Sequence, residues 1–250
     1  MLQNYKYGWL PDIPDIRDLK FSGMVKGALP KKVDLRSLHS LVYDQGALGS
    51  CTANALGSAY DFGRVRQKLK ATKPSRLFIY YNERAIIGTI NSDSGAYIRD
   101  GIKTMAKQGV CEETLWPYDI TKFKKKPAVA AYKDAKKSTV REYLRLDNRV
   151  LRDLKQCLAD GYGFVFGFSV YETIESEEVA RTGVVPMPKP GEQMLGGHAV
   201  FCVGYDDDRR EFIIRNSWGS GWGDRGHCYL PYDYVTDPNL ADDFWTIRLV

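Results

Sequence analysis

One cysteine near the start of the chain stands in a context that could make it a nucleophile. Cys51 follows a glycine and a serine, a pair typical of a loop that ends at a helix N-cap. No proline occurs from Cys51 to about Lys68, and apolar residues recur there at helical spacings, which predicts a helix that begins at Cys51. The positive end of a helix dipole favours thiolate over thiol, and thiolate is the nucleophile. A buried structural cysteine fits this stretch equally well.

Two later stretches contain residue types that activate a thiol. His198 follows Gly196 and Gly197 and leads into an apolar run, and Asn216 opens the sequence Asn-Ser-Trp-Gly-Ser-Gly-Trp-Gly. A histidine can take the proton of the thiol, and a neutral amide can orient the histidine ring. Each residue alone could be structural, as a histidine before a strand or a turn asparagine often is. Their joint occurrence in this order favours a catalytic site.

The order Gln45, Cys51, His198, Asn216 and the Asn-Ser-Trp-Gly-x-x-Trp-Gly signature resemble the papain-like cysteine peptidases, over about residues 33–234. His198 lies 147 positions after Cys51, within the family's usual spacing of about 130–150. The resemblance implies a cysteine endopeptidase that hydrolyses polypeptides through a thiol acyl-enzyme. A papain-like acyl or amide transferase and a catalytically silent binding homologue are the alternatives.

The resemblance also implies a role for each of these four residues. Cys51 would be the nucleophile, and His198 would hold an imidazolium beside its thiolate and later protonate the leaving amine. Asn216 would orient the histidine ring, and Trp218 would cover the contact between them. The side-chain amide of Gln45 and the backbone N–H of Cys51 would form the oxyanion hole.

The substrate-binding residues implied by the resemblance are Ser94, Gly95, Gly197 and Trp218. Gly95 precedes a predicted helix, where the family's glycine offers main-chain hydrogen bonds to an extended substrate. Two departures from the family affect this site. Thr52 replaces the common tryptophan after the nucleophile, and Gly197 replaces the aspartate that precedes the histidine in papain.

Hydrophobic periodicity separates a helical first half from a strand-rich second half. We expect an α+β, two-lobed papain-like fold, in which a helical lobe packs against an antiparallel β-rich lobe and the active site lies in the cleft between them. The helical lobe would span about residues 44–140 and the β-rich lobe about 141–250. The predicted helices cover residues 51–68, 74–84, 96–108 and 146–160, and the predicted strands cover 164–171, 200–205, 211–216, 228–230 and 244–249.

Residues 1–32, which we call the leader, precede the peptidase domain expected over residues 33–250. The segment 7–18 is rich in proline and aspartate and carries Trp9, Leu10 and Ile13, so it is predicted to be extended and attached to a surface. With this leader in place of a long helical pro-region, the chain looks like the microbial branch of the family. The leader is expected either to shade the cleft or to act as a structural strap elsewhere.

Composition favours an ordinary globular enzyme. The net charge is +5, and much of the local positive charge lies in 122–137, which we interpret as a solvated surface and not a nucleic-acid site. Asp206–Arg210 is predicted to be a turn without the ligand spacing of a calcium loop. His39 and His227 are expected to be structural. The sequence therefore predicts no metal, no cofactor and no nucleic-acid partner.

The five cysteines lack metal-ligand spacing. The family's disulfide partner, three positions before the nucleophile, is Leu48 here, so no disulfides are expected. No membrane span and no signal peptide are visible, which leaves the compartment open between cytoplasmic and secreted. We expect a monomer.

Overall fold

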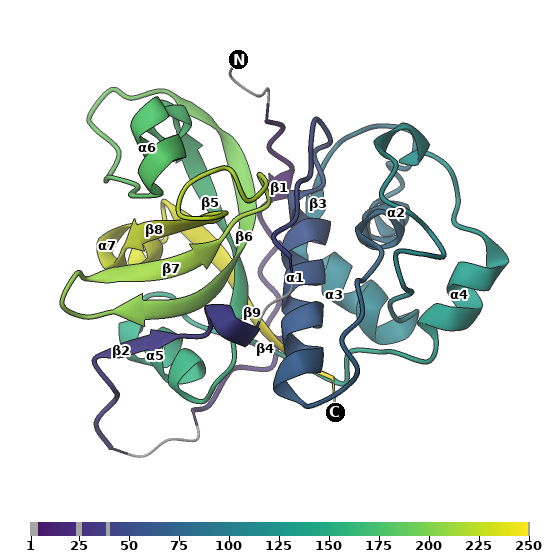
Figure 1. The fold of residues 1–250 in the computed structure, drawn as a ribbon, viewed down its shortest axis with the longest axis horizontal. Helices are drawn as coiled ribbons and strands as arrows, with labels where there is room; N and C mark the ends of the chain where they lie inside the picture. The colour runs from purple at the N-terminus through teal and green to yellow at the C-terminus, as the bar shows by residue number, and fades with distance from the viewer. Residues whose placement is uncertain (1–4, 24–26, 39–40, 250) are drawn as a thin grey trace.

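Helices α1–α4 and the large sheet occupy two separate parts of the structure (Figure 1). The computed structural model describes residues 5–23, 27–38 and 41–249, so the expectation for His39 lies outside the described residues. The helical part contains α1 (Cys51–Arg66), α2 (Arg76–Ile86), α3 (Ile98–Lys107) and α4 (Val129–Ala135). The predicted α+β class is confirmed by this division.

The strand-rich part is an antiparallel sheet. Its strand order is β4-β9-β5-β6-β7-β8, and β2 pairs with β6 beside this path. The strands are β2 (Lys32–Asp34), β4 (Glu142–Arg145), β5 (Phe164–Tyr171), β6 (Met194–Asp206), β7 (Glu211–Arg215), β8 (His227–Pro231) and β9 (Ala241–Arg248). Three short helices, α5 (Leu151–Ala159), α6 (Glu177–Thr182) and α7 (Tyr232–Thr236), accompany the sheet, and a short parallel pair, β1 (Trp9–Leu10) with β3 (Ala96–Tyr97), lies between the two parts (Figure 1).

Alternation along β6 explains why both faces of the sheet are covered. Phe201 and Val203 point into a core shared with α1, α2 and α3, whereas Val200 and Cys202 point into a second core on the other face. Because side chains alternate across a strand, one strand contributes to two cores. Strand β6 thereby links the helical part to the sheet, and α1 packs directly on it.

Most predicted elements were found with shifted ends. The helix expected over 146–160 begins at Leu151, because Asn148 turns inward and donates to the carbonyls of Val235 and Ala241. The strand expected over 200–205 extends from Met194 to Asp206, so His198 lies inside it and not at its start. The third predicted helix begins at Ile98, after the two residues of β3. Helix α1 and strand β5 were predicted within two residues.

A carboxyl group is buried in the helical part directly behind the first turn of α1. Glu83 is 0% exposed, and its Oε1 accepts a hydrogen bond of 2.6 Å from the Thr52 hydroxyl. Burial raises the pKa of Glu83 to about 8. The native protein therefore holds this proton at neutral pH, whereas the unfolded chain releases it.

This buried acid makes stability depend on pH. As the pH rises from 5 to 7.5, the free energy of unfolding should fall by about 3 kcal/mol through this group alone, because only the unfolded chain ionises it in that range. Glu83→Gln, which cannot ionise, should remove that share of the decrease. Urea unfolding of both proteins at pH 5 and pH 7.5 measures this decrease in the free energy of unfolding. An equal decrease in both proteins would show that Glu83 is already ionised in the native state.

Candidate functional site

The predicted nucleophile lies where α1 meets β6. Cys51 is the first residue of α1 and is 0% exposed, and its sulfur takes part in main-chain hydrogen bonds with Ala199 and Gly8. Ser50 is the N-cap residue, as expected, but its hydroxyl bonds to the Tyr118 hydroxyl at 2.5 Å in place of a helix N–H. Because Ala199 follows His198 on β6, these contacts bring residues 147 positions apart in the sequence to the same place.

His198 and Asn216 meet as expected. His198 Nε2 and Asn216 Oδ1 are 2.7 Å apart, and the same oxygen accepts the Ser217 N–H at 2.8 Å. An oxygen that accepts from Ser217 is also an acceptor for the ring, so the histidine proton is on Nε2. Among the described residues, Nδ1 is buried and has no hydrogen-bond partner, which leaves its lone pair available to a proton donor.

Trp218 covers this pair. Its ring stacks on the His198 ring with centroids 4.9 Å apart and an interplanar angle of 28°, and the indole is 3% exposed. Trp222 packs edge-on against Trp218. The aromatic cover excludes water from the hydrogen bond between His198 and Asn216, as the sequence motif suggested.

Gln45 is held so that its amide N–H₂ faces the cleft. The Ser217 hydroxyl donates to Gln45 Oε1 at 2.8 Å, which fixes the oxygen on the inner side. Gln45 Nε2 donates to the carbonyls of Leu48 at 3.0 Å and of Lys6 at 2.9 Å. The donor expected to serve the oxyanion hole thus already binds two main-chain carbonyls, of which that of Lys6 belongs to the leader.

The leader occupies the cleft along several residues. Besides the contacts of Lys6 with Gln45 and of Gly8 with Cys51, the Gly8 carbonyl accepts the Ala96 N–H at 2.8 Å. The Tyr5 ring stacks on Trp218 with centroids 4.0 Å apart, and Lys6 pairs with Asp93 at 2.9 Å. Of the two expected positions for the leader, the structure has the one in which it covers the cleft.

Burial under the leader changes the charge state expected for the catalytic pair. It raises the pKa of the Cys51 thiol to about 11, despite the opposing effect of the main-chain hydrogen bonds. It lowers the pKa of His198 to about 4, despite the hydrogen bond to Asn216. A thiolate–imidazolium pair was expected from the sequence. With the leader docked, both shifts favour the neutral forms, because desolvation disfavours both charges. The ion pair stays a prediction for the chain with its leader displaced.

The four predicted substrate-binding residues differ in their surroundings. A Cβ built on Gly95 would lie 2.1 Å from the Gly8 carbonyl oxygen, so a side chain there would collide with the extended segment in the cleft. The Gly95 N–H bonds to the Tyr80 hydroxyl, and it is Ala96 that donates to the leader. Ser94 bonds to Thr89 and to the Gly95 carbonyl. Gly197 and Trp218 both contact the leader.

Sequence reasoning missed the buried acidic cluster that holds the leader. Asp12, from the leader, accepts the indole N–H of Trp245 at 3.1 Å, and its own N–H donates to Asp243 at 2.7 Å. Burial raises the pKa of both carboxyl groups, and their proximity adds to the effect for Asp243. No sequence signal joins residues more than 230 positions apart. The charged groups that face this pair are Asp18, Arg99, Arg145 and Asp242.

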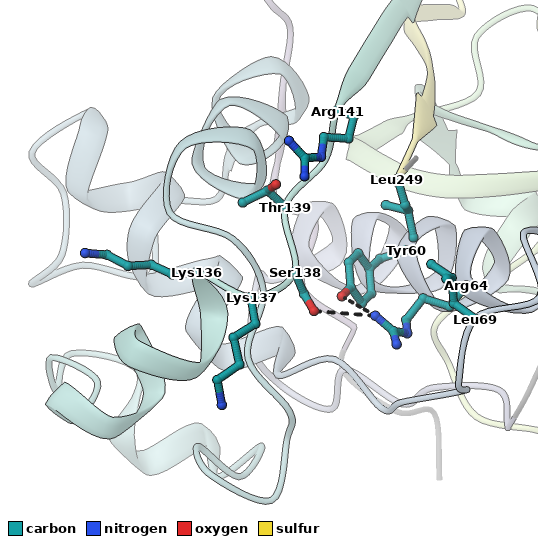
Figure 2. Close-up of a pocket in the computed structure, with 9 residues that line it drawn as sticks. All are labelled: Tyr60, Arg64, Leu69, Lys136, Lys137, Ser138, Thr139, Arg141 and Leu249. Atoms are coloured by element: carbon teal, nitrogen blue, oxygen red, sulfur yellow. Dashed lines mark hydrogen bonds between the residues drawn. The ribbon is translucent and has the colours of Figure 1, made fainter.

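Other candidate features lie away from the cleft. A cavity of about 300 Å³ at the C-terminal half of α1 is lined by Tyr60, Arg64, Leu69, Lys136, Lys137, Ser138, Thr139, Arg141 and Leu249 and contains none of the predicted site residues (Figure 2). His227 bonds through Nδ1 to nearby carbonyls, in keeping with a structural role. The five cysteines are all free and buried.

The described residues contain no group of three or more histidine, cysteine, aspartate or glutamate side chains placed to hold a metal ion. They also contain no helix with the length and apolar character needed to cross a membrane.

Comparisons with solved structures identify the fold. Xylellain, a cysteine protease from Xylella fastidiosa, is 46% identical with a TM-score of 0.91, and the match covers 100% of this chain and 98% of that one. Procathepsin L 3 from the Tenebrio molitor larval midgut shares the fold with a TM-score of 0.75 at 19% identity, over 99% of this chain and 77% of that one. The predicted papain-like fold is confirmed.

Proteins of similar sequence indicate the same family. An uncharacterized peptidase C1-like protein of Acanthamoeba polyphaga mimivirus is 44% identical over 98% of this chain and 87% of its own length. Cysteine proteinase 3 of Entamoeba histolytica is 26% identical over 82% of this chain, which spans 64% of that proteinase. The papain family cysteine protease model matches residues 29–242. The chain therefore belongs to the papain family of cysteine proteases.

Proposed function

We propose that this cysteine peptidase is an endopeptidase whose own leader closes the active site. Cys51 is the nucleophile, His198 the acid and base, Asn216 the residue that orients the ring, and Gln45 an oxyanion-hole donor. One observation carries the proposal: the main chain of leader residues 6–8 contacts both Gln45 and Cys51, at the place where a substrate backbone would have to lie. Residues 33–250 form the peptidase domain in this proposal, and its substrates are polypeptides.

The reaction begins with the leader displaced. The Cys51 thiol gives its proton to His198 Nδ1, and the sulfur attacks the carbonyl carbon of the scissile peptide. The resulting oxyanion accepts hydrogen bonds from Gln45 Nε2 and the Cys51 N–H. His198 then protonates the leaving amine as the C–N bond breaks, which leaves a thioester. A water molecule gives its proton to His198 and attacks the thioester, and the returning proton restores the thiol.

Labelling by an epoxide inhibitor tests this proposal directly. Hydrolysis of a peptide substrate should fall in proportion to the fraction of Cys51 that carries the inhibitor, as measured by mass spectrometry of the digested protein. Hydrolysis that continues after Cys51 is fully labelled would contradict the assignment of the nucleophile.

Gln45 offers a separate test of the oxyanion hole. In Gln45→Ala, kcat for peptide hydrolysis should fall about 10²–10³-fold, because one donor to the oxyanion is lost. Alkylation of Cys51 by iodoacetamide forms no oxyanion, so its rate should not fall. A parallel loss of both rates would mean that Gln45 maintains the structure of the site and does not stabilise the oxyanion.

The buried acidic cluster predicts that leader docking depends on pH. Docking raises the pKa of Asp12 and Asp243, so the docked state binds protons more tightly and is favoured at low pH. Docking should therefore weaken as the pH rises from 5 to 8. Stopped-flow measurement of Trp9 fluorescence would report leader release, and Asp12→Asn should show a smaller change with pH than the native chain. An equal change in both would exclude Asp12 as a titrating group.

A further inference from the structure

The loop over residues 44–51, which we call the oxyanion loop, carries both donors that the proposed mechanism assigns to the oxyanion. Gln45 lies near its start, and Cys51 lies at its end, where α1 begins. No disulfide restrains this loop, because all five cysteines are free. A displacement of about 1 Å within an active site can lower the rate by roughly 10²-fold. The contacts that fix the oxyanion loop therefore matter for catalysis.

The main chain of Gln45 is held from both parts of the structure. Its N–H donates to the Ser217 carbonyl at 2.9 Å on the strand-rich side. Its carbonyl accepts the Tyr118 hydroxyl at 3.0 Å on the helical side. Because a phenol has a single proton, the Ser50 hydroxyl is the donor in its 2.5 Å hydrogen bond with the Tyr118 oxygen. One hydroxyl group thus connects Gln45 to the residue that precedes the nucleophile.

Arg76 of α2 contacts the oxyanion loop at both ends. The residue is only 4% exposed, and its Nη1 donates to the Asp44 carbonyl at 3.1 Å and to Asn54 Oδ1 at 2.9 Å. Asn54 in turn donates from Nδ2 to the Ser50 carbonyl at 2.9 Å. Asp44 and Ser50 directly precede the two donor residues. One buried guanidinium therefore fixes the main chain beside each donor.

Further contacts keep Arg76 and Tyr118 in place. The Nε and Nη2 atoms of Arg76 bind the two carboxylate oxygens of Glu113 at 3.0 and 3.2 Å. The guanidinium also lies over two phenol rings, 3.9 Å from the centroid of Tyr118 and 4.6 Å from that of Tyr43. This combination needs a planar, forked cation, which a lysine ammonium does not provide. Arg76 thereby also fixes the ring whose hydroxyl reaches the oxyanion loop.

We propose that Arg76 and Tyr118 are positioning residues that hold the oxyanion loop so that the Gln45 amide is aimed at the oxyanion. The inference rests on the proposed endopeptidase mechanism, in which Gln45 is a donor. The other donor, the Cys51 N–H, is also held by α1, so Gln45 depends more on the loop. In the part of the chain that the structure describes, the contacts of Arg76 and Tyr118 with the loop involve no leader residue. Displacement of the leader therefore leaves them in place.

Tyr118→Phe tests the hydroxyl alone, because it keeps the ring over Arg76. The background is the full-length Trp9→Ala chain, since Trp9 is 9% exposed and donates to Asp243, and its loss should weaken leader docking. In this background kcat for peptide hydrolysis should fall about tenfold, which is less than for loss of the donor itself. KM and the rate of Cys51 alkylation by iodoacetamide should change less than about twofold, because neither depends on the oxyanion.

Tyr132→Phe is the matched control. The Tyr132 hydroxyl, in α4, donates to Asn82 Oδ1 of α2 at 2.9 Å, so the substitution removes a similar hydrogen bond outside the oxyanion loop. It should leave kcat within about twofold. Arg76→Lys keeps the charge and loses the fork, so kcat should again fall about tenfold while the alkylation rate stays unchanged. An unchanged kcat in Arg76→Lys would exclude Arg76 as a positioning residue.

A double variant separates positioning from a general loss of stability. When Tyr118→Phe is added to Gln45→Ala, kcat should not fall further, because the side chain that the hydroxyl positions is already absent, whereas independent effects would multiply. If the two losses multiply, the positioning proposal is wrong. It is also wrong if Tyr118→Phe lowers kcat no more than Tyr132→Phe while Gln45→Ala lowers it, and the proposed function then stands. If peptide hydrolysis survives Cys51→Ala, both are wrong.

Discussion

Peptide hydrolysis by the full-length chain should rise about 100-fold at neutral pH when Trp9 is replaced by alanine. Removal of a buried tryptophan costs about 3–5 kcal/mol, and every 1.4 kcal/mol changes an equilibrium tenfold. Here the loss falls on leader docking, because the Trp9 side chain contacts Gly167, Gly197 and Asp243 of the peptidase domain. Initial rates on a peptide substrate, with the rate of Cys51 labelling measured in parallel, give the size of the change.

Ile13→Ala is the matched control for this experiment. Ile13 is also an apolar leader residue, but it is 75% exposed, so its loss should change the hydrolysis rate less than twofold. If Trp9→Ala is no faster than the native chain, then docking of the leader does not limit activity. If Ile13→Ala hydrolyses the peptide equally fast, the increase in rate does not come from loss of the Trp9 contacts with Gly167, Gly197 and Asp243.

Replacement of the proposed nucleophile should have the opposite effect and nearly abolish hydrolysis. Cys51→Ala in the Trp9→Ala background should lower kcat by about 10⁴-fold or more, because a chain without the thiol cannot form the acyl-enzyme. The substitution removes one small buried atom and should leave the fold intact. Hydrolysis measured over hours, with far-ultraviolet circular dichroism as a check on folding, is the appropriate assay.

Cys228→Ala separates this effect from the general loss of a buried thiol. Cys228 is 2% exposed and lies in β8, in the core on the far face of the sheet. Its replacement should reduce stability slightly and leave kcat within about twofold. Equal activity of Cys51→Ala and Cys228→Ala would exclude Cys51 as the nucleophile.

The contact between His198 and Asn216 could be predicted because the proposed catalytic residues stand in recognisable local contexts. Gln45, Cys51 and Asn216 each lie in a short motif, and the hydrogen bond between His198 and Asn216 follows from the roles assigned to them. Helix α1 and strand β5 were also predictable, because their apolar residues recur with a regular period.

The contacts of the leader could not be predicted in the same way. The hydrogen bond from Trp9 to Asp243 joins residues 234 positions apart. The backbone φ of Asp243 is +60°, and no turn motif in the sequence predicts this conformation. Asp12 appears in the sequence as one of three acidic residues in the segment 11–18, which contains two prolines. Only the folded chain shows that it is buried against Trp245.

The charge state of the catalytic pair in the leader-docked chain could not be predicted for a related reason. The rule that a helix N-terminus lowers a thiol pKa assumes that the thiol can be solvated. The structure buries Cys51 completely beneath Gly8, and desolvation then outweighs the helix dipole. We therefore predict the ion pair only for the chain with its leader displaced, where the thiol can be solvated.

The pH dependence of Cys51 alkylation tests this account most directly. In Trp9→Ala, where leader docking is expected to be weakened, the rate should already be high at pH 6 and should change little up to pH 8, as expected for a thiolate paired with imidazolium. In the native chain the rate should be low at pH 6 and should rise with pH as leader docking weakens. A Trp9→Ala profile that rises with an inflection near pH 8.5, as for an ordinary thiol, would contradict the claim that leader docking alone keeps the pair neutral.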